Sequence, residues 1–453
     1  MKAFKASNRN QPFLLPPSIQ DWLPQEHLAR FIIETVEQLD LSKIKSQYNG
    51  RGKDAYAPQV MLSLLFYGYA TGVFSSRKIE RATYDSIAFR YISANTHPDH
   101  DTIANFRKRF LDELTDLFVQ ILSIAQEMGI LKVGKVSLDG TKVKASASKH
   151  KALSYAHAIK LQKQLEDEVK LLLEKAKTAD DENDCDGMNI PDEIARRKDR
   201  LEVIKAAKLK IEHRANERHQ QEQKDYEEKI QKRELKEKKT GKKPKGRKPQ
   251  APKSKEPDLK DQVNLTDEES RIMPVSGGGY MQAYNAQASV EHESRLIVHQ
   301  HVTQNVNDKK EVLPTLKWFK ENPTLMPDSM LADAGYFSEE NVKLCENVKI
   351  TPYISFGKEQ HNQPLEDRFQ EVQALLEDAT DVEIMKHRLQ TKEGKEIYAQ
   401  RKSMIEPIFG IIKHVMGFRQ FMLRGFEKSK GEWNLMCIAY NLKRLHTITV
   451  TVE

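Results

Sequence analysis

The sequence predicts a mixed α/β protein with an all-α N-terminal domain and an inserted helical hairpin. Apolar residues recur at helical spacing through residues 1–130, and short apolar strands alternate with helices after residue 264. Between them lies a long charged stretch with a period of its own, which separates these strands from an earlier strand near residue 139. The three patterns divide the chain into a helical domain, a sheet and an insertion within that sheet.

The N-terminal domain, residues 1–130, is predicted to bind DNA. Helices are expected at residues 28–39 and 58–69, and another begins near residue 75. Residues 101–110 open with a capping residue and place apolar side chains at helical spacing. A helix with an apolar back and a basic front can contact DNA, although basic faces are also common on ordinary surface helices. Its candidate DNA-binding residues are Arg107, Lys108 and Arg109.

A short strand is expected around Asp139-Gly140, within residues 131–150. An Asp-Gly pair is most often a turn, and this alternative stays open. The following residues, 151–264, are predicted to be an insertion that forms an antiparallel helical hairpin. Its two apolar stripes step by three, four or seven residues: Ala158, Leu161, Leu165, Val169, Leu172 and Ala176, then Ile194, Leu201, Ile204, Ile211 and Ala215.

The charge of the chain is concentrated at the end of this insertion. The 453 residues carry a formal net charge of +7, and residues 236–260 alone hold eleven Lys or Arg against three acidic residues. Glycine and proline in residues 241–249 predict a disordered linker. A basic run suits a polyanion such as nucleic acid, and the alternative is a solvated linker. Its candidate DNA-binding residues are Lys242, Lys243, Lys245, Arg247 and Lys248.

The remaining segment, residues 265–453, is expected to supply most of a mixed sheet and several helices. Its apolar runs predict a hairpin, two further strands and the helices between them. The expected strands are residues 280–291, 295–303, 329–333 and 350–355, and the expected helices are residues 311–321, one from about 338, one opened by Glu406, and 432–445.

Cysteine usage and hydropathy exclude several classes of protein. Cys185, Cys345 and Cys437 stand apart without metal-ligand spacing, so neither a disulfide framework nor a structural zinc site is expected. The N-terminus lacks the apolar run of a signal peptide, and the most apolar segment, residues 60–70, is too short to span a bilayer. We therefore expect a soluble cytoplasmic protein without a membrane partner.

Three carboxylates occupy suggestive positions. Asp139 and Asp333 each follow an apolar strand, where open α/β sheets place their ligands, and Glu406 is expected to open a helix. Carboxylates from separate elements are what a two-Mg²⁺ phosphoryl-transfer site requires. Singly, each has a structural alternative. Asp139 can form a turn and Asp333 can cap a helix. Glu406 can complete a capping box with Ser403, or can itself cap a helix that starts at Pro407.

The motifs around these acids resemble those of a known family. They are Ser-Leu-Asp-Gly-Thr-Lys-Val-Lys-Ala at 137–145, Leu-Ala-Asp-Ala-Gly-Tyr at 331–336 and Glu-Pro-Ile-Phe-Gly-Ile-Ile-Lys at 406–413. Segments at 16–18, 27–31, 98–103, 424–426 and 433–442 extend the likeness over nearly the whole chain. The chain resembles the DDE transposases of bacterial insertion sequences, in the group with a helical N-terminal domain before an RNase-H-like core.

The resemblance implies a site and its ions. Asp139, Asp333 and Glu406 would be the catalytic, metal-binding residues, with two Mg²⁺ ions per site for which Mn²⁺ can substitute. Residues 131–150 would supply the first strand of the RNase-H-like catalytic core, and residues 265–453 its remainder. Four further residues would contact DNA: Tyr398, Arg401, Lys402 and Lys413. The family usually has a basic residue four positions before the catalytic glutamate. Lys402 occupies that position and Arg401 lies five positions before Glu406, so both are candidates for this basic residue.

The function that the resemblance implies is transposition in the bacterial cytosol, at the nucleoid. The protein would bind the inverted-repeat ends of its insertion sequence, cleave double-stranded DNA by two-metal hydrolysis and transfer the 3′-OH strand to target DNA. A homodimer or larger assembly on DNA is implied. The alternatives are an RNase-H-like nuclease without strand transfer and a catalytically inactive, domesticated DNA-binding protein.

Overall fold

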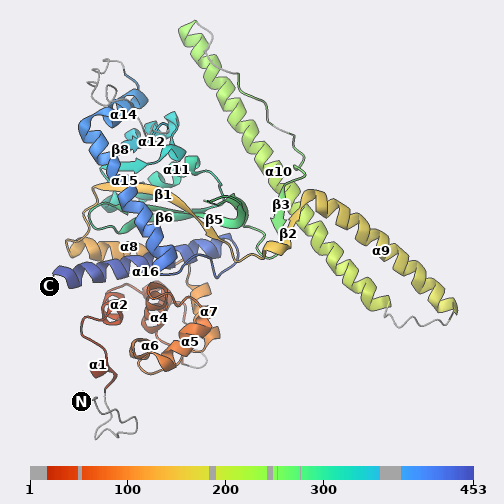
Figure 1. The fold of residues 1–453 in the computed structure, drawn as a ribbon, viewed down its shortest axis with the longest axis horizontal. Coiled ribbons are helices and arrows are strands. Elements are labelled where there is room, and N and C mark those ends of the chain that lie inside the picture. The colour runs from red at the N-terminus through yellow and green to blue at the C-terminus, as the bar shows by residue number, and fades with distance from the viewer. Residues whose placement is uncertain are drawn as a thin grey trace, which may run out of the picture. The chain divides into compact units, whose positions relative to one another are not determined.

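The computed structural model describes residues 18–48, 54–182, 190–241, 248–252, 254–275, 277–357 and 379–452. It divides into two compact units (Figure 1). The first comprises Met1–Ser146 and Ile272–Glu453, and the second is Ala147–Arg271. None of the described helices combines the length and the apolar character that a bilayer crossing requires.

The N-terminal part of the first unit is helical, as predicted. Its central helix is buried from Met61 to Ala70 and is contacted by several of the others, and Pro58 occupies its first turn, where a missing N–H costs nothing. The helices are α1 (Ile19–Trp22), α2 (Leu28–Glu37), α3 (Ser42–Lys45), α4 (Pro58–Ala70), α5 (Ser76–Asp85), α6 (Ile87–Ile92), α7 (His100–Arg109) and α8 (Leu114–Glu127). The cap of α7 is Asp99, which accepts a hydrogen bond from the Thr102 N–H, so this helix begins slightly earlier than expected.

The rest of the first unit is built on a mixed sheet. Strand β5 pairs antiparallel with β1 and β6, whereas β7 pairs parallel with β1 and β8. The resulting order is β6-β5-β1-β7-β8, and β4 pairs with β5 as well. The strands are β1 (Lys135–Lys144), β4 (Arg271–Pro274), β5 (Tyr280–Glu291), β6 (Ile297–Thr303), β7 (Ser329–Ala332) and β8 (Thr351–Ile354). The predicted mixed α/β class with a helical N-terminal region is confirmed.

Helices and short turns cover the sheet (Figure 1). The long C-terminal helix α16 contacts α4 and α8 as well as β6, and it thereby joins the N-terminal helices to the sheet. Helix α15 contacts β1, β5 and β7. The helices are α11 (Val312–Glu321), α12 (Glu339–Asn347), α14 (Asp381–Gln390), α15 (Lys392–Gly410) and α16 (Phe426–Val452), and the short turns are η2 (Asp308–Lys310), η3 (Pro323–Leu325), η4 (Ala334–Tyr336) and the π-turn η5 (Ile411–Val415).

The expected start of a helix at Glu406 is wrong. Thr391 caps α15 through the Gly394 N–H, and Glu406 and Pro407 lie well inside the helix. The preference of proline for a first turn was outweighed by packing, because Arg401, Ile405 and Ile408 bury one continuous face of α15. Ser403 and Glu406 therefore form no capping box.

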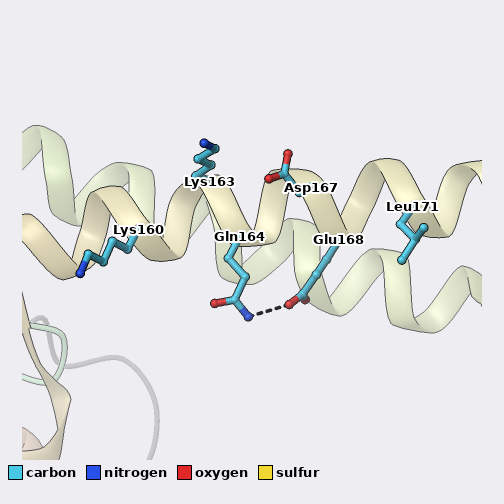
Figure 2. Close-up of a pocket in the computed structure, with 6 residues that line it drawn as sticks. All are labelled: Lys160, Lys163, Gln164, Asp167, Glu168 and Leu171. Atoms are coloured by element: carbon cyan, nitrogen blue, oxygen red, sulfur yellow. Dashed lines mark hydrogen bonds between the residues drawn. The ribbon is translucent and has the colours of Figure 1, made fainter.

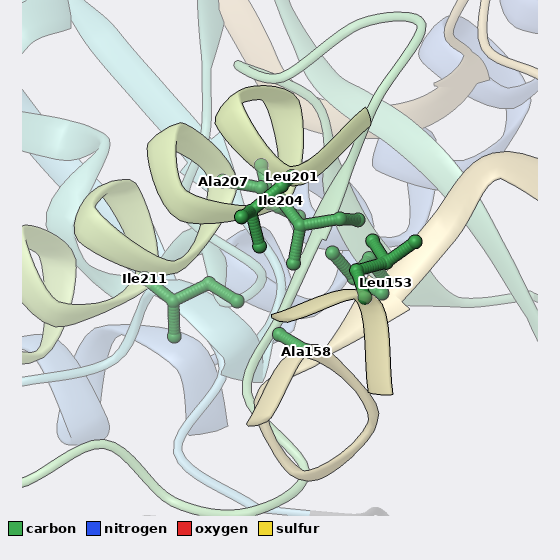
Figure 3. Packing of buried hydrophobic residues seen from close by; sticks show 8 residues of the cluster. Leu153, Ala158, Leu201, Ile204, Ala207 and Ile211 are labelled. Carbon is green, nitrogen blue, oxygen red and sulfur yellow. The ribbon is translucent and has the colours of Figure 1, made fainter. Parts of the chain in front are cut away.

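The second unit is a helical hairpin on a small two-stranded sheet. Strand β2 (Ala152–Ser154) pairs antiparallel with β3 (Gln262–Asn264), and α9 (Tyr155–Glu182) lies beside α10 (Ile190–Thr240). The short turn η1 (Lys149–Lys151) precedes β2. The insertion expected at residues 151–264 lies within this unit. Figure 3 shows its core, which contains Leu153, Ala158, Leu165, Leu201, Ile204, Ala207, Ile211 and Val263.

A hollow on the surface of α9 is lined by six side chains (Figure 2). Charges of both signs surround it, and Gln164 donates a hydrogen bond to Glu168 one turn further on, at 2.7 Å. Mixed charge at helical spacing is typical of a solvated face. The side chains around the hollow are Lys160, Lys163, Gln164, Asp167, Glu168 and Leu171.

Candidate active site

Asp139 lies in the middle of a strand. Asp139 pairs with Ala288 and Gly140 with Gln287, and β1 continues beside β5 as far as Lys144. The alternative of an Asp-Gly turn is therefore wrong, and so is the expectation that Asp139 ends its strand. Gly140 is required for a different reason. A Cβ at this position would lie 2.1 Å from Gln287 Nε2 and 2.8 Å from Asp308 Oδ1.

Asp333 reaches the same edge of the sheet from β7. The parallel pairing of β1 with β7 ends at Ser137 and Leu331, and two residues further along each chain are Asp139 and Asp333. The register thus sets the two aspartates level, just beyond the point where the pairing of β1 with β7 ends and where open α/β sheets bind ligands. Asp333 also caps η4 by accepting from the Gly335 N–H at 2.8 Å.

The electrostatic environment of Asp139 disfavours its charge. Burial raises the pKa of this carboxyl from 3.8 to about 6, and the negative charges of Asp333 and Asp308 act in the same direction. A hydrogen bond from the Gly140 N–H and the charge of Arg401 oppose this rise. Asp139 and Asp333 are thus close enough to repel each other, and a bound cation would relieve this repulsion.

Helix α15 brings a buried arginine to this pair. The Arg401 side chain is 7% exposed, and its Nη1 lies 3.5 Å from Asp139 Oδ2. Its Nε and Nη1 have no hydrogen-bond partner within the described part of the chain. One turn earlier, the Tyr398 hydroxyl donates to the carbonyl of Ala332, the residue before Asp333, at 3.4 Å. Lys402 is exposed, so the geometry favours Arg401 over Lys402 as the basic residue of the site.

Lys413 reaches β1 from the π-turn that follows α15. Its Nζ donates to Thr141 Oγ1 at 2.6 Å and to the Lys142 carbonyl at 2.9 Å. Burial lowers the pKa of this ammonium, and the charge of Lys142 adds to the effect. The Lys413 ammonium is therefore held beside Thr141, two residues after Asp139 on β1.

Glu406 does not share this arrangement. It is exposed on α15, and five helical residues place it about 140° around the helix axis from Arg401. Among the residues that the structure describes, no three His, Cys, Asp or Glu side chains converge closely enough to hold a metal ion. The structure therefore brings together Asp139, Asp333, Arg401, Tyr398 and Lys413, and leaves Glu406 outside.

The expected basic face of α7 is only partly present. Arg107 is 6% exposed and donates to the Tyr69 hydroxyl at 3.0 Å and to the Phe74 carbonyl at 2.8 Å. A buried, hydrogen-bonded guanidinium cannot reach DNA, so the prediction for Arg107 is corrected to a structural role. Lys108 and Arg109 are exposed, and Arg109 lies over the rings of Tyr48 and Phe110.

The structure describes the basic run, residues 236–260, except for residues 242–247 and 253. Lys242, Lys243, Lys245 and Arg247 lie outside the described residues, whereas Lys248 is described and exposed. Its proposed role in DNA binding stays a prediction.

Sequence reasoning missed a polar cluster beside Gly140. Asp308 Oδ1 accepts from Asn285 Nδ2 at 2.6 Å, from Gln287 Nε2 at 2.7 Å and from Lys142 Nζ at 3.3 Å. The signal was the alternation of polar residues along 285–291. That pattern predicts a strand with a solvated face, but in the structure this polar face is buried.

Two parts of the chain match known families. Residues 17–109 match the family described as Transposase domain (DUF772), and residues 219–442 match the one described as Transposase DDE domain. Together the matches cover more than two thirds of the chain. The chain belongs to the DDE transposases of insertion sequences. No curated protein and no solved structure matches this transposase.

The family matches include some of the candidate site residues and omit others. Asp333 and Glu406 lie within the DDE domain match, whereas Asp139 lies outside both matches. The assignment of Asp139 therefore rests on the strand register with Asp333 and on the contact with Arg401. DDE transposases generally use divalent metals. Two carboxylates that repel each other at one sheet edge fit a hard divalent cation.

Proposed function

We propose that this transposase binds the inverted-repeat ends of its insertion sequence, hydrolyses the DNA there and transfers the freed 3′-OH to target DNA. The observation that carries the proposal is the level register of Asp139 and Asp333 beside the buried Arg401. Two carboxylates beside a buried guanidinium suit a phosphodiester held on divalent cations. A nuclease that only cuts would use the same residues, so strand transfer has its own assay below.

The carboxylates would hold the ions. Asp139 and Asp333 would bind Mg²⁺, or Mn²⁺ in its place, and Glu406 is the third carboxylate that the family likeness assigns. When bound, two ions supply Lewis acids that activate the attacking water or 3′-OH and stabilise the leaving oxygen. The positive charge of a bound ion would also oppose the rise in the pKa of Asp139 that burial causes.

The cationic residues of α15 and η5 would position the DNA backbone. The Nε and Nη1 of Arg401 are buried donors without a hydrogen-bond partner in the described chain, although Nη1 lies 3.5 Å from Asp139 Oδ2, and a phosphate oxygen would accept from them. Tyr398 would hold the β7 end of the site through the Ala332 carbonyl. Lys413 and Lys402 would add charge close to the scissile phosphate.

The remaining DNA contacts are assigned to exposed cations elsewhere in the chain. We assign the N-terminal domain, residues 1–130, to binding of the element ends, with Lys108 and Arg109 as its contacts. The basic run with Lys248 would hold the DNA backbone. Joining two ends requires two active sites, so we propose a homodimer or larger assembly on DNA.

The test is cleavage of a duplex that carries one end of the element, with Mg²⁺ and the full chain. Asp139→Asn and Asp333→Asn are expected to lower the cleavage rate about a thousandfold, which is roughly 4 kcal/mol of transition-state stabilisation. Glu406→Gln is expected to have the same effect, because Glu406 is proposed as the third carboxylate of the site. Binding to the uncut duplex without metal should persist in all three variants.

Glu340→Gln is the matched control, because it neutralises an exposed carboxylate seven residues after Asp333. An Asp139→Asn chain that binds DNA and cuts at the wild-type rate would remove Asp139 from the site. Precut ends supplied to the wild-type chain test the second step. Joined products support a transposase, and cutting without joining supports the nuclease alternative.

A further inference from the structure

One face of β5 is polar and yet fully buried. Asn285, Gln287, Ser289 and Glu291 alternate along the strand, and none is more than 1% exposed. Burying an amide or a carboxylate is costly unless its donors and acceptors are paired. These side chains must therefore be paired with groups on neighbouring elements, and their partners indicate what each one does.

The side chain of Gln287 has all its hydrogen-bonding groups engaged. Its Nε2 donates to Asp308 Oδ1 at 2.7 Å and to Asn285 Oδ1 at 3.1 Å, while its Oε1 accepts from the Tyr336 hydroxyl. Asp308 Oδ1 also accepts from Asn285 Nδ2 and Lys142 Nζ, so the amide nitrogen of Gln287 faces Asp308 and its amide oxygen faces Tyr336. The Gln287 carbonyl accepts from Trp433 Nε1 at 3.1 Å. Hydrogen bonds therefore hold both the backbone and the side chain of Gln287 in place.

Gln287 spans the space between the two segments that carry the aspartates. It pairs with Gly140 across the strands, and a Cβ on Gly140 would come within 2.1 Å of Gln287 Nε2. The amide nitrogen therefore packs on the β1 backbone one residue after Asp139. At its other end, Tyr336 closes the η4 turn that Asp333 caps. One buried side chain thus touches the strand of one aspartate and the turn of the other.

We propose that Gln287 is a positioning residue of the active site. Its amide, oriented by Asp308 and Tyr336, sets the separation of Asp139 and Asp333 and thereby the affinity of the pair for a divalent cation. The inference rests on the proposed function, since it requires that the two aspartates bind metal. Residues behind metal ligands typically change metal affinity by about 10- to 100-fold when they are replaced.

The experiment is a calorimetric titration of the full chain with Mn²⁺ in the absence of DNA. Gln287→Met keeps the length of the side chain but removes its three hydrogen bonds, and Tyr336→Phe removes only the hydroxyl. Both are expected to weaken Mn²⁺ binding about tenfold, while DNA binding without metal stays at the wild-type level. Tyr336→Phe also serves as the test if Gln287→Met does not fold.

Ser289→Ala is the matched control. Ser289 lies two residues along the same buried face, and its hydroxyl pairs with His299 Nδ1 at 3.3 Å instead of with the site. Its loss is expected to leave Mn²⁺ affinity unchanged. Folded Gln287→Met and Tyr336→Phe chains with wild-type Mn²⁺ affinity would overturn the positioning role alone. Equal Mn²⁺ uptake by the wild-type and Asp139→Asn chains would overturn the metal site, and the positioning role with it.

Discussion

At the scale of single residues, Asp139 and Arg107 show opposite relations between charge and burial. Arg107 is buried, and its Nη1 donates to the Tyr69 hydroxyl and to the Phe74 carbonyl, which joins α7 to α4. Asp139 is buried beside other carboxylates, and Arg401 compensates only in part. The first arrangement favours stability, whereas the second is typical of a site whose charge is balanced when a ligand binds.

Without metal, the ionisation of Asp139 should destabilise the fold. The folded chain holds this proton up to about pH 6 and the unfolded chain only to 3.8, so the folded state binds more protons in between. The stabilising contribution is complete below 3.8 and is lost as the pH rises through about 6. The loss corresponds to roughly 3 kcal/mol of unfolding free energy at neutral pH.

The measurement is urea unfolding in the presence of a chelator, for the wild type and for Asp139→Asn. The Asn variant cannot titrate, so at neutral pH it should be the more stable of the two, and its advantage should shrink as the pH falls. Parallel stability curves for the two chains over that pH window would contradict the assigned pKa shift.

The sequence predicted part of the site at this scale. Asp139 and Asp333 were predicted from the local strand pattern that precedes each of them. The partners of Arg107 could not be predicted, because consecutive residues of a helix point about 100° apart and the packing of α4 decides which of them is buried. The same limit left the choice between Arg401 and Lys402 open until the buried face of α15 was known.

At the scale of elements, β1 and β5 place the site. Their antiparallel register sets Gly140 against Gln287, and the absent side chain makes room for the amide and for Asp308. The strands themselves were predicted from apolar periodicity. The buried polar face of β5 was not, because alternation shows that two faces differ but does not show what covers each of them.

Gly140→Ala is expected to destabilise the chain by about 1–3 kcal/mol, because the new methyl group would overlap Gln287 Nε2, Asp308 Oδ1 and Asn285 Oδ1. Gly134→Ala is the matched control on the segment that leads into β1. Its Cβ would meet nothing nearer than Asp328 Oδ2 at 3.8 Å, and neither glycine has a left-handed backbone. Chemical unfolding measures both, and equal losses would show that the site around Gly140 is less closely packed than described.

At the scale of the whole molecule, the chain consists of two units with separate cores. The hairpin of the second unit was predicted because its stripes of buried residues repeat within one helix at a time. Pairing of β1 with β5 and β7 joins residues far apart in the chain, and no local pattern encodes such partners. Fold class was therefore predictable from the sequence, but strand order was not.

Because the two units have separate cores, a substitution in the core of one unit is expected to destabilise that unit alone. Ile204 is 2% exposed in the hairpin core, and Ile204→Ala should cost about 2–5 kcal/mol in the second unit. Val203, its neighbour, is 51% exposed, so Val203→Ala should change stability by only about 0.5 kcal/mol or less. Hydrogen exchange should accelerate along α9 and α10 in Ile204→Ala and remain unchanged in β1 and β5. Faster exchange in β1 as well would contradict the independence of the cores.

The pairing of β2 with β3 has a consequence for how the chain folds during synthesis. Strand β1 leaves the ribosome before β5, and the two strands can pair only after the whole insertion between them has been synthesised. Ala152 pairs directly with Asn264, so a folded hairpin brings the two ends of the insertion together. The loop that β1 and β5 must close then shortens at least fourfold, and each halving of its length saves roughly 0.6 kcal/mol of closure entropy. An insertion that folds first would thus speed the assembly of the sheet it interrupts.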